Sequence, residues 1–129
     1  MCNTDNFISI QKWGWRKMNN KKFSNKQEKG IAKAINGRKQ SNSGATPFYK
    51  GDVESKYFLI EAKTMTTEKE SFTIKKAWLD QLRQESIGMR KPYHALGFNF
   101  GGLNNTTNYY IIDERTFKLL NDLLNMQEE

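Results

Sequence analysis

The fold is decided by one stretch of this 129-residue chain, which reads Gly51-Asp52-Val53-Glu54-Ser55-Lys56-Tyr57-Phe58-Leu59-Ile60-Glu61-Ala62-Lys63. From Tyr57 to Lys63, the alternation of a strand puts the odd-numbered side chains on one face and the even-numbered ones on the other. The polar segment 54–56 predicts a turn, and antiparallel pairing across it brings Asp52 beside Glu61. The stretch therefore predicts a hairpin that carries two carboxylates and the Lys63 ammonium at one end.

These charges indicate a chemistry. Two carboxylates held together repel each other, and the pKa of each rises unless a cation neutralises them. Mg²⁺ suits such a pair, because it prefers a few carboxylate oxygens together with waters and substrate phosphate. Lys63 shares a face with Glu61, where it would orient a water and stabilise the negative charge on a phosphate under attack. The group indicates phosphodiester hydrolysis, and a solvated ion cluster at a sheet edge is the alternative interpretation.

Hydrophobic periodicity and turn signals predict the elements around this hairpin. They are a helix over residues 24–37, a strand near 41–46, the hairpin over 49–63, a helix over 71–87, strands over 93–100 and 108–112, and a last helix capped by Asp113. This order, α-β-β-β-α-β-β-α, predicts an α/β fold with helices packed on a mixed β-sheet. The chain has no internal repeat and no dividing linker, so we expect a basic arm over 1–23 and one domain over 24–129.

Capping signals and apolar stripes add detail to the helices. Ser24 and Gln27 resemble a capping box at the start of the first helix, and Asn36-Gly37 predicts its end. Ser71 is placed to cap the second, where free backbone N–H groups and Lys75 or Lys76 would favour a phosphate, although ordinary capping explains the pattern equally well. The side chains expected to be buried are Ile74, Trp78, Leu79 and Leu82 in the second helix and Phe117, Leu120 and Leu124 in the last.

Glu28 lies on the apolar stripe of the first predicted helix, because Glu28, Ile31 and Ile35 are spaced i, i+3 and i+7. A carboxylate on a core-facing stripe is costly unless it finds a partner, and a metal ion or a basic side chain would serve. The alternative is an acid near the helix start that the helix dipole stabilises. Glu28 is therefore a third candidate acid.

This series of features resembles the PD-(D/E)xK nuclease superfamily and, within it, the small Holliday-junction resolvases of archaea and phages. Those families place in order a helix with a Glu, a Ser- and Gly-rich segment, an Asp that opens a hairpin, a Glu-x-Lys triplet and a long helix. The corresponding features here are Glu28, Ser41-Asn42-Ser43-Gly44-Ala45, Gly51-Asp52-Val53, Glu61-Ala62-Lys63 and the helix over 71–87. The resemblance covers residues 24–100. The family's Pro-Asp is Gly51-Asp52 here, which keeps the acid and loses the proline.

The resemblance implies a restriction-endonuclease-like fold and a Mg²⁺-dependent DNA endonuclease, in which Mn²⁺ substitutes for Mg²⁺. It implies that Asp52, Glu61 and the Ala62 carbonyl hold the metal, that Glu28 completes the site, and that Lys63 assists the attacking water. It also implies four-way or branched DNA as substrate and a homodimer that makes paired nicks. Two alternatives stay open: a nicking, repair or general endonuclease of the same fold that acts on linear duplex, and a non-catalytic DNA-binding protein.

The basic charge is local. Residues 1–50 hold eleven Lys or Arg against Asp5 and Glu28, whereas residues 51–129 hold ten against twelve acids, although the whole chain carries +7. Lys and Arg release counterions from a phosphate backbone, and the interleaved Trp13 and Trp15 could stack on unpaired bases or pack on the core. A Lys- and Asn-rich composition can also reflect an A+T-rich genome. The candidate DNA-binding residues are Lys12, Arg16, Lys17, Lys21, Lys22, Lys26, Arg38, Lys39, Ser41, Ser43, Lys75 and Lys76.

Several classes of protein are disfavoured by what the sequence lacks. It has no apolar run long enough to cross a bilayer and no glycine-rich nucleotide loop, so we expect neither a membrane span nor a nucleotide cofactor. The single Cys2 excludes an internal disulfide framework and a multi-cysteine zinc site, which favours a reducing, cytoplasmic location. His94 is the only histidine, and we expect it to be an ordinary strand residue.

Overall fold

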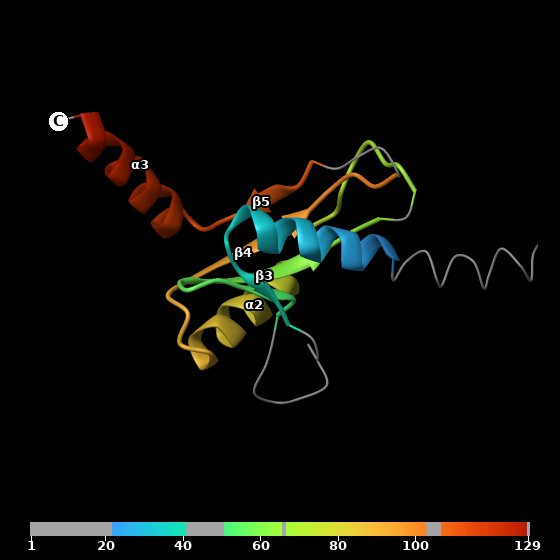
Figure 1. Cartoon of the computed structure of the whole chain (residues 1–129), viewed down its shortest axis with the longest axis horizontal. Coiled ribbons are helices and arrows are strands. Elements are labelled where there is room, and N and C mark those ends of the chain that lie inside the picture. The colour runs from blue at the N-terminus through green and yellow to red at the C-terminus, as the bar shows by residue number, and fades with distance from the viewer. Residues whose placement is uncertain (1–21, 41–50, 66, 103–106, 129) are drawn as a thin grey trace, which may run out of the picture.

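The computed structural model describes residues 22–40, 51–65, 67–102 and 107–128 (Figure 1). Its elements in chain order are a helix over 22–34, β1 Arg38–Lys39, β2 Val53–Glu54, β3 Phe58–Lys63, α2 Lys76–Gly88, β4 Tyr93–Phe98, β5 Tyr109–Ile111 and α3 Glu114–Glu128. The strands form one sheet in the order β1-β2-β3-β4-β5. β3 and β4 are parallel, and the other neighbours are antiparallel. The predicted mixed α/β architecture is confirmed.

Both faces of the sheet are covered, as expected for a sheet whose two central strands are parallel and joined by a helix. The helix over 22–34 packs Ile31 against Val53, Ile60 and Ala95 on one face. On the other face, α2 packs Leu82 against Leu59 and Leu96. The two helices lie on either side of the strands in Figure 1. The period-2 alternation predicted for residues 57–63 is confirmed, because Leu59 and Ile60 enter different clusters.

The predicted hairpin is formed by β2 and β3, with Val53 opposite Ile60 and Glu54 opposite Leu59. Its turn is closed by the Ser55 N–H, which donates to the Phe58 carbonyl at 3.0 Å, and by the Phe58 N–H, which donates to the Ser55 hydroxyl at 3.2 Å. The regular register ends at Val53, because the Asp52 N–H donates to the Ile60 carbonyl at 3.0 Å and its carboxylate accepts the Ala62 N–H at 2.8 Å, which places Asp52 beside residues 60–62. The hairpin therefore carries the candidate site at its open end.

Gly51 adopts a backbone conformation that proline cannot adopt. Its φ is positive, at +77°, whereas a proline ring locks φ in the negative range. A Cβ at this position would also lie 2.6 Å from a Leu59 methyl carbon. The conformation and the close approach both require glycine, and they aim the chain so that Asp52 follows directly at the end of the hairpin.

We expect Gly51→Ala to lower the free energy of unfolding by about 2–3 kcal/mol, from a left-handed backbone and the contact with Leu59. Gly88→Ala is the matched control, because Gly88 ends α2 and a Cβ there meets no atom within 4 Å. The control is expected to be neutral or slightly stabilising, since alanine favours a helix. Urea unfolding of both variants measures the difference, and equal stabilities would contradict the role given to Gly51.

The first helix differs from its prediction at the start and agrees with it at the end. Residues 22 and 23 are already helical, so Ser24 lies inside the helix and the predicted capping box is wrong. The helix ends where Asn36 adopts a φ of +52° and the Gly37 N–H donates to the Ala32 carbonyl at 2.8 Å. This left-handed stop is the one that Asn36-Gly37 predicts.

The second helix begins later than predicted. α2 starts at Lys76, its cap residue Lys75 makes no side-chain cap, and Ser71 lies outside the helix, so the predicted Ser71 cap is wrong. Phe72 packs instead against Phe98, with ring centroids 4.7 Å apart. This aromatic contact ties the segment before α2 to β4. Ile74 is therefore outside the helix and 42 % exposed, whereas Trp78, Leu79 and Leu82 pack on the sheet as predicted.

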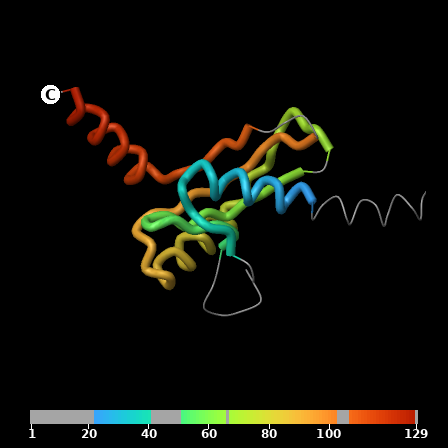
Figure 2. Tube along the Cα trace, viewed as in Figure 1, coloured from blue at the N-terminus to red at the C-terminus, as the bar shows by residue number. Residues whose placement is uncertain are grey.

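The third helix is capped as predicted but not buried. The Thr116 N–H donates to the Asp113 carboxylate at 2.9 Å, which confirms the cap. The expected burial of Phe117, Leu120 and Leu124 is wrong, because all three are at least half exposed. α3 extends away from the sheet beyond its first turn, as the tube in Figure 2 shows. Periodicity predicted an apolar face correctly, but it could not tell whether that face meets the body of the chain.

Two other expectations concern particular segments. The strand predicted near 41–46 and most of the arm over 1–23 lie outside the described residues, while the two-residue β1 at Arg38–Lys39 was not predicted. Short polar strands such as β1 carry no periodic signal and form because a neighbouring strand offers its edge. No helix in the described part of the chain is long and apolar enough to cross a membrane.

Candidate active site

Asp52 is fixed at the open end of the hairpin by three hydrogen bonds. Its N–H donates to the Ile60 carbonyl at 3.0 Å, and its carbonyl accepts the Gln40 N–H at 2.8 Å. Its carboxylate oxygen Oδ2 accepts the Ala62 N–H at 2.8 Å. The side chain thus continues the pairing between the strands beyond the point where β2 stops. In an extended strand, the N–H and C=O of one residue point to the same side, so the Ala62 carbonyl also opens toward Asp52.

Glu61 and Lys63 project from β3 on the face that α2 covers. Lys63 Nζ lies 3.6 Å from Glu61 Oε1 and 4.5 Å from the centroid of the Trp78 ring. Both side chains remain partly accessible, with 27 % of Glu61 and 31 % of Lys63 exposed. Burial, and then the nearby Asp52 charge, raise the pKa of Glu61 to about 7, although Lys63 opposes the shift. Glu61 is therefore a carboxyl group whose ionisation the site resists.

Glu28 reaches the same end of the hairpin from the first helix. Its side chain is 13 % exposed and forms an ion pair with Lys39 of β1 at 3.3 Å. Burial raises the pKa of Glu28, and the Asp52 carboxylate raises it further, both by its charge and through a hydrogen bond, whereas Lys39 opposes both. The three acids are thus linked through Asp52, which influences Glu28 on one side and Glu61 on the other. The apolar-stripe argument placed Glu28 correctly.

An open pocket lies over Glu61 and Lys63 and is lined by residues of α2, namely Trp78, Gln81, Leu82 and Glu85. Gln81 Nε2 donates to Glu85 Oε1 at 2.9 Å, and the Glu85 charge contributes to the raised pKa of Glu61. Gln81 is an exposed residue of α2. It nevertheless lines the pocket in which the Glu-x-Lys triplet lies, so α2 forms the wall facing this site.

The fit of a metal ion to these residues rests on their charges. Half-buried carboxyl groups whose pKa is raised by burial and by a neighbouring carboxylate are the donor type that a hard divalent cation takes, and a bound cation would remove the repulsion. Within the described residues, no three His, Cys, Asp or Glu side chains are gathered closely enough to form a metal-holding group. The chemistry of the donors fits Mg²⁺, whereas a complete ligand shell is not assembled by three acids alone. Waters and the Ala62 carbonyl would have to supply the remaining ligands.

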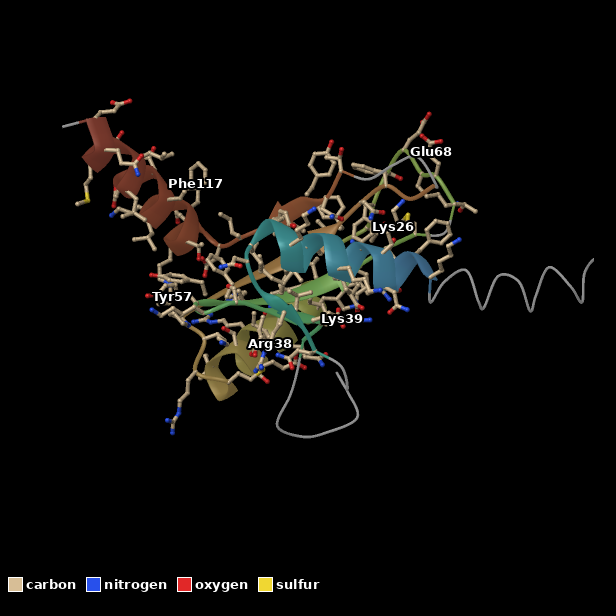
Figure 3. The ribbon with its side chains drawn as sticks, in the orientation of Figure 1. Lys26, Arg38, Lys39, Tyr57, Glu68 and Phe117 are labelled. Carbon is tan, nitrogen blue, oxygen red and sulfur yellow. The ribbon has the colours of Figure 1, made fainter. Side chains whose placement is uncertain are left out.

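The candidate DNA-binding residues fall into three sets. Lys12, Arg16, Lys17, Lys21, Ser41 and Ser43 lie outside the described residues. Lys22, Lys26 and Lys75 are exposed, and Figure 3 shows Lys26 on the first helix. The remaining three are in ion pairs: Arg38 with Glu54, Lys39 with Glu28, and Lys76 with Asp80. Arg38 stays 73 % exposed and Lys76 stays 87 % exposed, so both present charge to solvent despite their partners.

Two neighbours of the site were not predicted from sequence. Gln27 donates from Nε2 to the Lys63 carbonyl at 2.7 Å and thereby ties the first helix to the end of β3. Lys39 was assigned to DNA contact rather than to Glu28. The spacing of the helix was a usable signal for the first contact. Gln27 lies four residues before Ile31 and therefore on the buried face, where an amide needs hydrogen-bond partners. No local pattern predicts the ion pair between Lys39 and Glu28, because the two residues meet only when β1 joins the sheet.

The raised pKa of Glu61 predicts a specific pH dependence of stability. The unfolded carboxyl ionises near 4.5 and the folded one near 7, so the folded state binds more protons between these values. The free energy of unfolding is therefore expected to fall as pH rises from about 5 to 7, by up to about 3 kcal/mol. Glu61→Gln should lack this part, and urea unfolding without divalent metal at pH 5 and pH 8 measures it.

The comparison with Glu61→Gln is needed because His94 contributes with the opposite sign. Burial lowers the pKa of His94, so its neutral form is favoured in the fold and its contribution to stability rises with pH. Wild type and variant both keep His94, so its contribution cancels when their pH dependences are subtracted. Equal pH slopes in wild type and variant would contradict the pKa of Glu61.

No protein-family model, curated protein or solved structure matches this chain.

Proposed function

We propose that this chain is a Mg²⁺-dependent DNA endonuclease of the PD-(D/E)xK type, with a restriction-endonuclease-like fold, that nicks four-way or branched DNA in pairs. The observation that carries the proposal is the arrangement at the open end of the hairpin. The Asp52 carboxylate binds the Ala62 N–H there and raises the pKa of Glu61, Lys63 Nζ is 3.6 Å from Glu61, and Glu28 approaches from the first helix. Two or three acids and one ammonium on adjacent elements are what metal-assisted phosphodiester hydrolysis needs.

Each residue has a proposed role. Asp52, Glu61 and the Ala62 carbonyl would hold the metal, with Glu28 supporting the shell. When bound, Mg²⁺ would supply charge stabilisation at the phosphate and activate a water. Lys63 would donate hydrogen bonds to that water or to a phosphate oxygen, since its Nζ lies in the open pocket between Glu61 and Trp78. Trp78 holds the ammonium over its ring, which keeps it aimed at the site.

The substrate part of the proposal rests on charge. Exposed Lys22 and Lys26 on the first helix, with Arg38 beside β2, would track the phosphate backbone near the acids. The strongly basic balance of residues 1–50 supports a polyanionic partner. Paired nicks in a symmetric four-way junction need two active sites, so we propose a homodimer.

The experiment that tests this function is cleavage of a labelled four-way junction beside a matched linear duplex, with Mg²⁺, with Mn²⁺ and with EDTA. Paired metal-dependent nicks near the junction centre, absent in Glu61→Ala, are the expected result. Equal cutting of the linear duplex would assign the chain to a general or repair endonuclease. Binding of DNA without cutting would make it a non-catalytic DNA-binding protein.

Metal binding itself has a readout that does not need cleavage. A ligand that binds only the folded state raises stability, by about 2.7 kcal/mol at 100 times its dissociation constant. We expect Mg²⁺ to raise the melting temperature at pH 8, which is above the pKa of Glu61, and to do so much less in Asp52→Asn. An equal shift in both proteins, or in neither, would contradict the assigned ligands.

A further inference from the structure

The C-terminal helix α3 presents a large apolar face that no other described part of the chain covers. At 100° per residue, its apolar side chains occupy one half of the circumference, and Lys118, Asn121, Asp122 and Asn125 lie on the other half. The exposed apolar side chains are Phe117 at 62 %, Leu119 at 36 %, Leu120 at 50 %, Leu123 at 48 %, Leu124 at 54 % and Met126 at 68 %.

The helix is held firmly at its base. Asp113 caps it, and Thr116 in the first turn is 5 % exposed. Arg115 donates to the Pro92 carbonyl and lies 5.2 Å from the centroid of the Tyr93 ring. From Phe117 onward every described residue is exposed, and Figure 3 shows Phe117 standing clear of the sheet. A helix that is anchored at one end and apolar along its length is built to meet another surface.

We propose that α3 pairs with the α3 of a second copy of this chain in an antiparallel, two-fold symmetric contact. The six exposed apolar side chains offer roughly 550 Å² per copy, toward the upper end of the roughly 300–600 Å² that the largest apolar patch of an ordinary monomer covers, and such patches are often functional. Pairing would bury the part of this area that faces the partner helix, and the surface around the base of α3 would supply the rest of the roughly 1,200 Å² of a specific interface. An apolar half-helix is also complementary to itself, as a two-fold contact requires.

Charge along the helix sets its direction. The first half of α3 contains Glu114, Arg115 and Lys118 and has a net positive charge. The second half contains Asp122 and Glu128 and is negative. Antiparallel pairing brings opposite charges and opposite helix dipole ends together, and parallel pairing brings like charges together. An anionic lipid surface or DNA would need an excess of Lys and Arg on the polar face, which α3 lacks.

The mass of the full chain in solution, measured by light scattering and sedimentation over a range of concentrations, tests the pairing. The wild-type mass is expected to be twice the 15.1 kDa of one chain. Leu124→Glu should weaken the dimer by about 100-fold or more, because each dimer loses two buried leucines. Asn125→Glu makes a similar charge change on the next residue, on the polar face, and should leave the dimer intact. Circular dichroism verifies that both variants stay folded.

A second measurement tests the direction of pairing. Gln127→Cys in a Cys2→Ser background places one thiol near the end of each α3. Antiparallel helices hold the two thiols too far apart for a disulfide, whereas parallel helices bring them together. A rapid inter-chain disulfide would overturn the antiparallel arrangement. Three results would overturn the pairing itself. The wild-type mass could be that of one chain at every concentration, or Leu124→Glu and Asn125→Glu could have equal effects. The third is that the wild type binds vesicles and only Leu124→Glu loses this binding.

Homodimerisation is part of the proposed function, but these measurements contain neither DNA nor metal. A dimer without nuclease activity would leave the α3 pairing standing and reject the proposed function. A dimer that makes paired nicks and keeps its mass in Leu124→Glu would do the reverse.

Discussion

Glu61→Gln is expected to lower metal-dependent DNA cleavage by at least about 1,000-fold while raising the stability of the fold at pH 8. The first effect follows because a metal ion contributes several kcal/mol to transition-state stabilisation, and the rate depends exponentially on that free energy. The second follows because Glu61 resists ionisation, with a pKa of about 7, and glutamine is neutral at every pH. Single-turnover cleavage and urea unfolding measure the two effects separately.

The matched control is Glu85→Gln. Glu85 lies on α2 in the pocket over Glu61, and its charge also raises the pKa of Glu61, but it does not belong to the Glu-x-Lys triplet. We expect this variant to keep cleavage within about tenfold of wild type. Equal losses of cleavage in the two variants would mean that cleavage depends on the overall charge of the pocket, and the role given to Glu61 would be wrong.

Leu96→Ala is expected to have the largest effect on stability and to lower the free energy of unfolding by about 2–5 kcal/mol. Leu96 is fully buried in β4, where it packs with Leu59 of β3 and Leu82 of α2. Truncation removes three carbon atoms at the point where α2 meets the two central strands. Such a loss is a large part of the roughly 5–15 kcal/mol that holds a domain of ordinary stability together.

Ile87→Ala is the control for this prediction, since it also removes three carbon atoms, but from a side chain of α2 that is 67 % exposed. Its stability should stay within about 0.5 kcal/mol of wild type. Comparison of the two urea midpoints separates burial from side-chain identity. A small loss for Leu96→Ala would mean that the core is less tightly packed around β4 than the structure shows.

The parts of the fold that the sequence predicted are those fixed by short-range interactions. The alternation over 57–63, the stop at Asn36 and the cap at Asp113 each depend on a few adjacent residues, and all three are formed. The errors arose where distant contacts decide. Phe72 stays out of α2 because it packs on Phe98, and the apolar face of α3 is exposed because the sheet ends before it.

The candidate site shows the same division. Asp52 and Glu61 come close because a short turn pairs the two strands that carry them, and Glu28 was found through its place on a stripe. The pairing of Glu28 with Lys39 depends on the sheet and had no local signal. Trp78 was predicted only as a core residue, although its ring also lies under the Lys63 ammonium.

The hydrogen bond from the Ala62 N–H to the Asp52 carboxylate affects whether Asp52 or Glu61 would be replaced sooner in descendants of this chain. Asp52 satisfies a strand N–H, so selection for stability alone would preserve it after any loss of activity. Glu61 lowers stability at neutral pH, and neutral drift would soon replace it unless its charge were used. In descendant sequences, a glutamate at position 61 would therefore be the better record of retained chemistry, whereas an aspartate at position 52 would record only a retained hairpin.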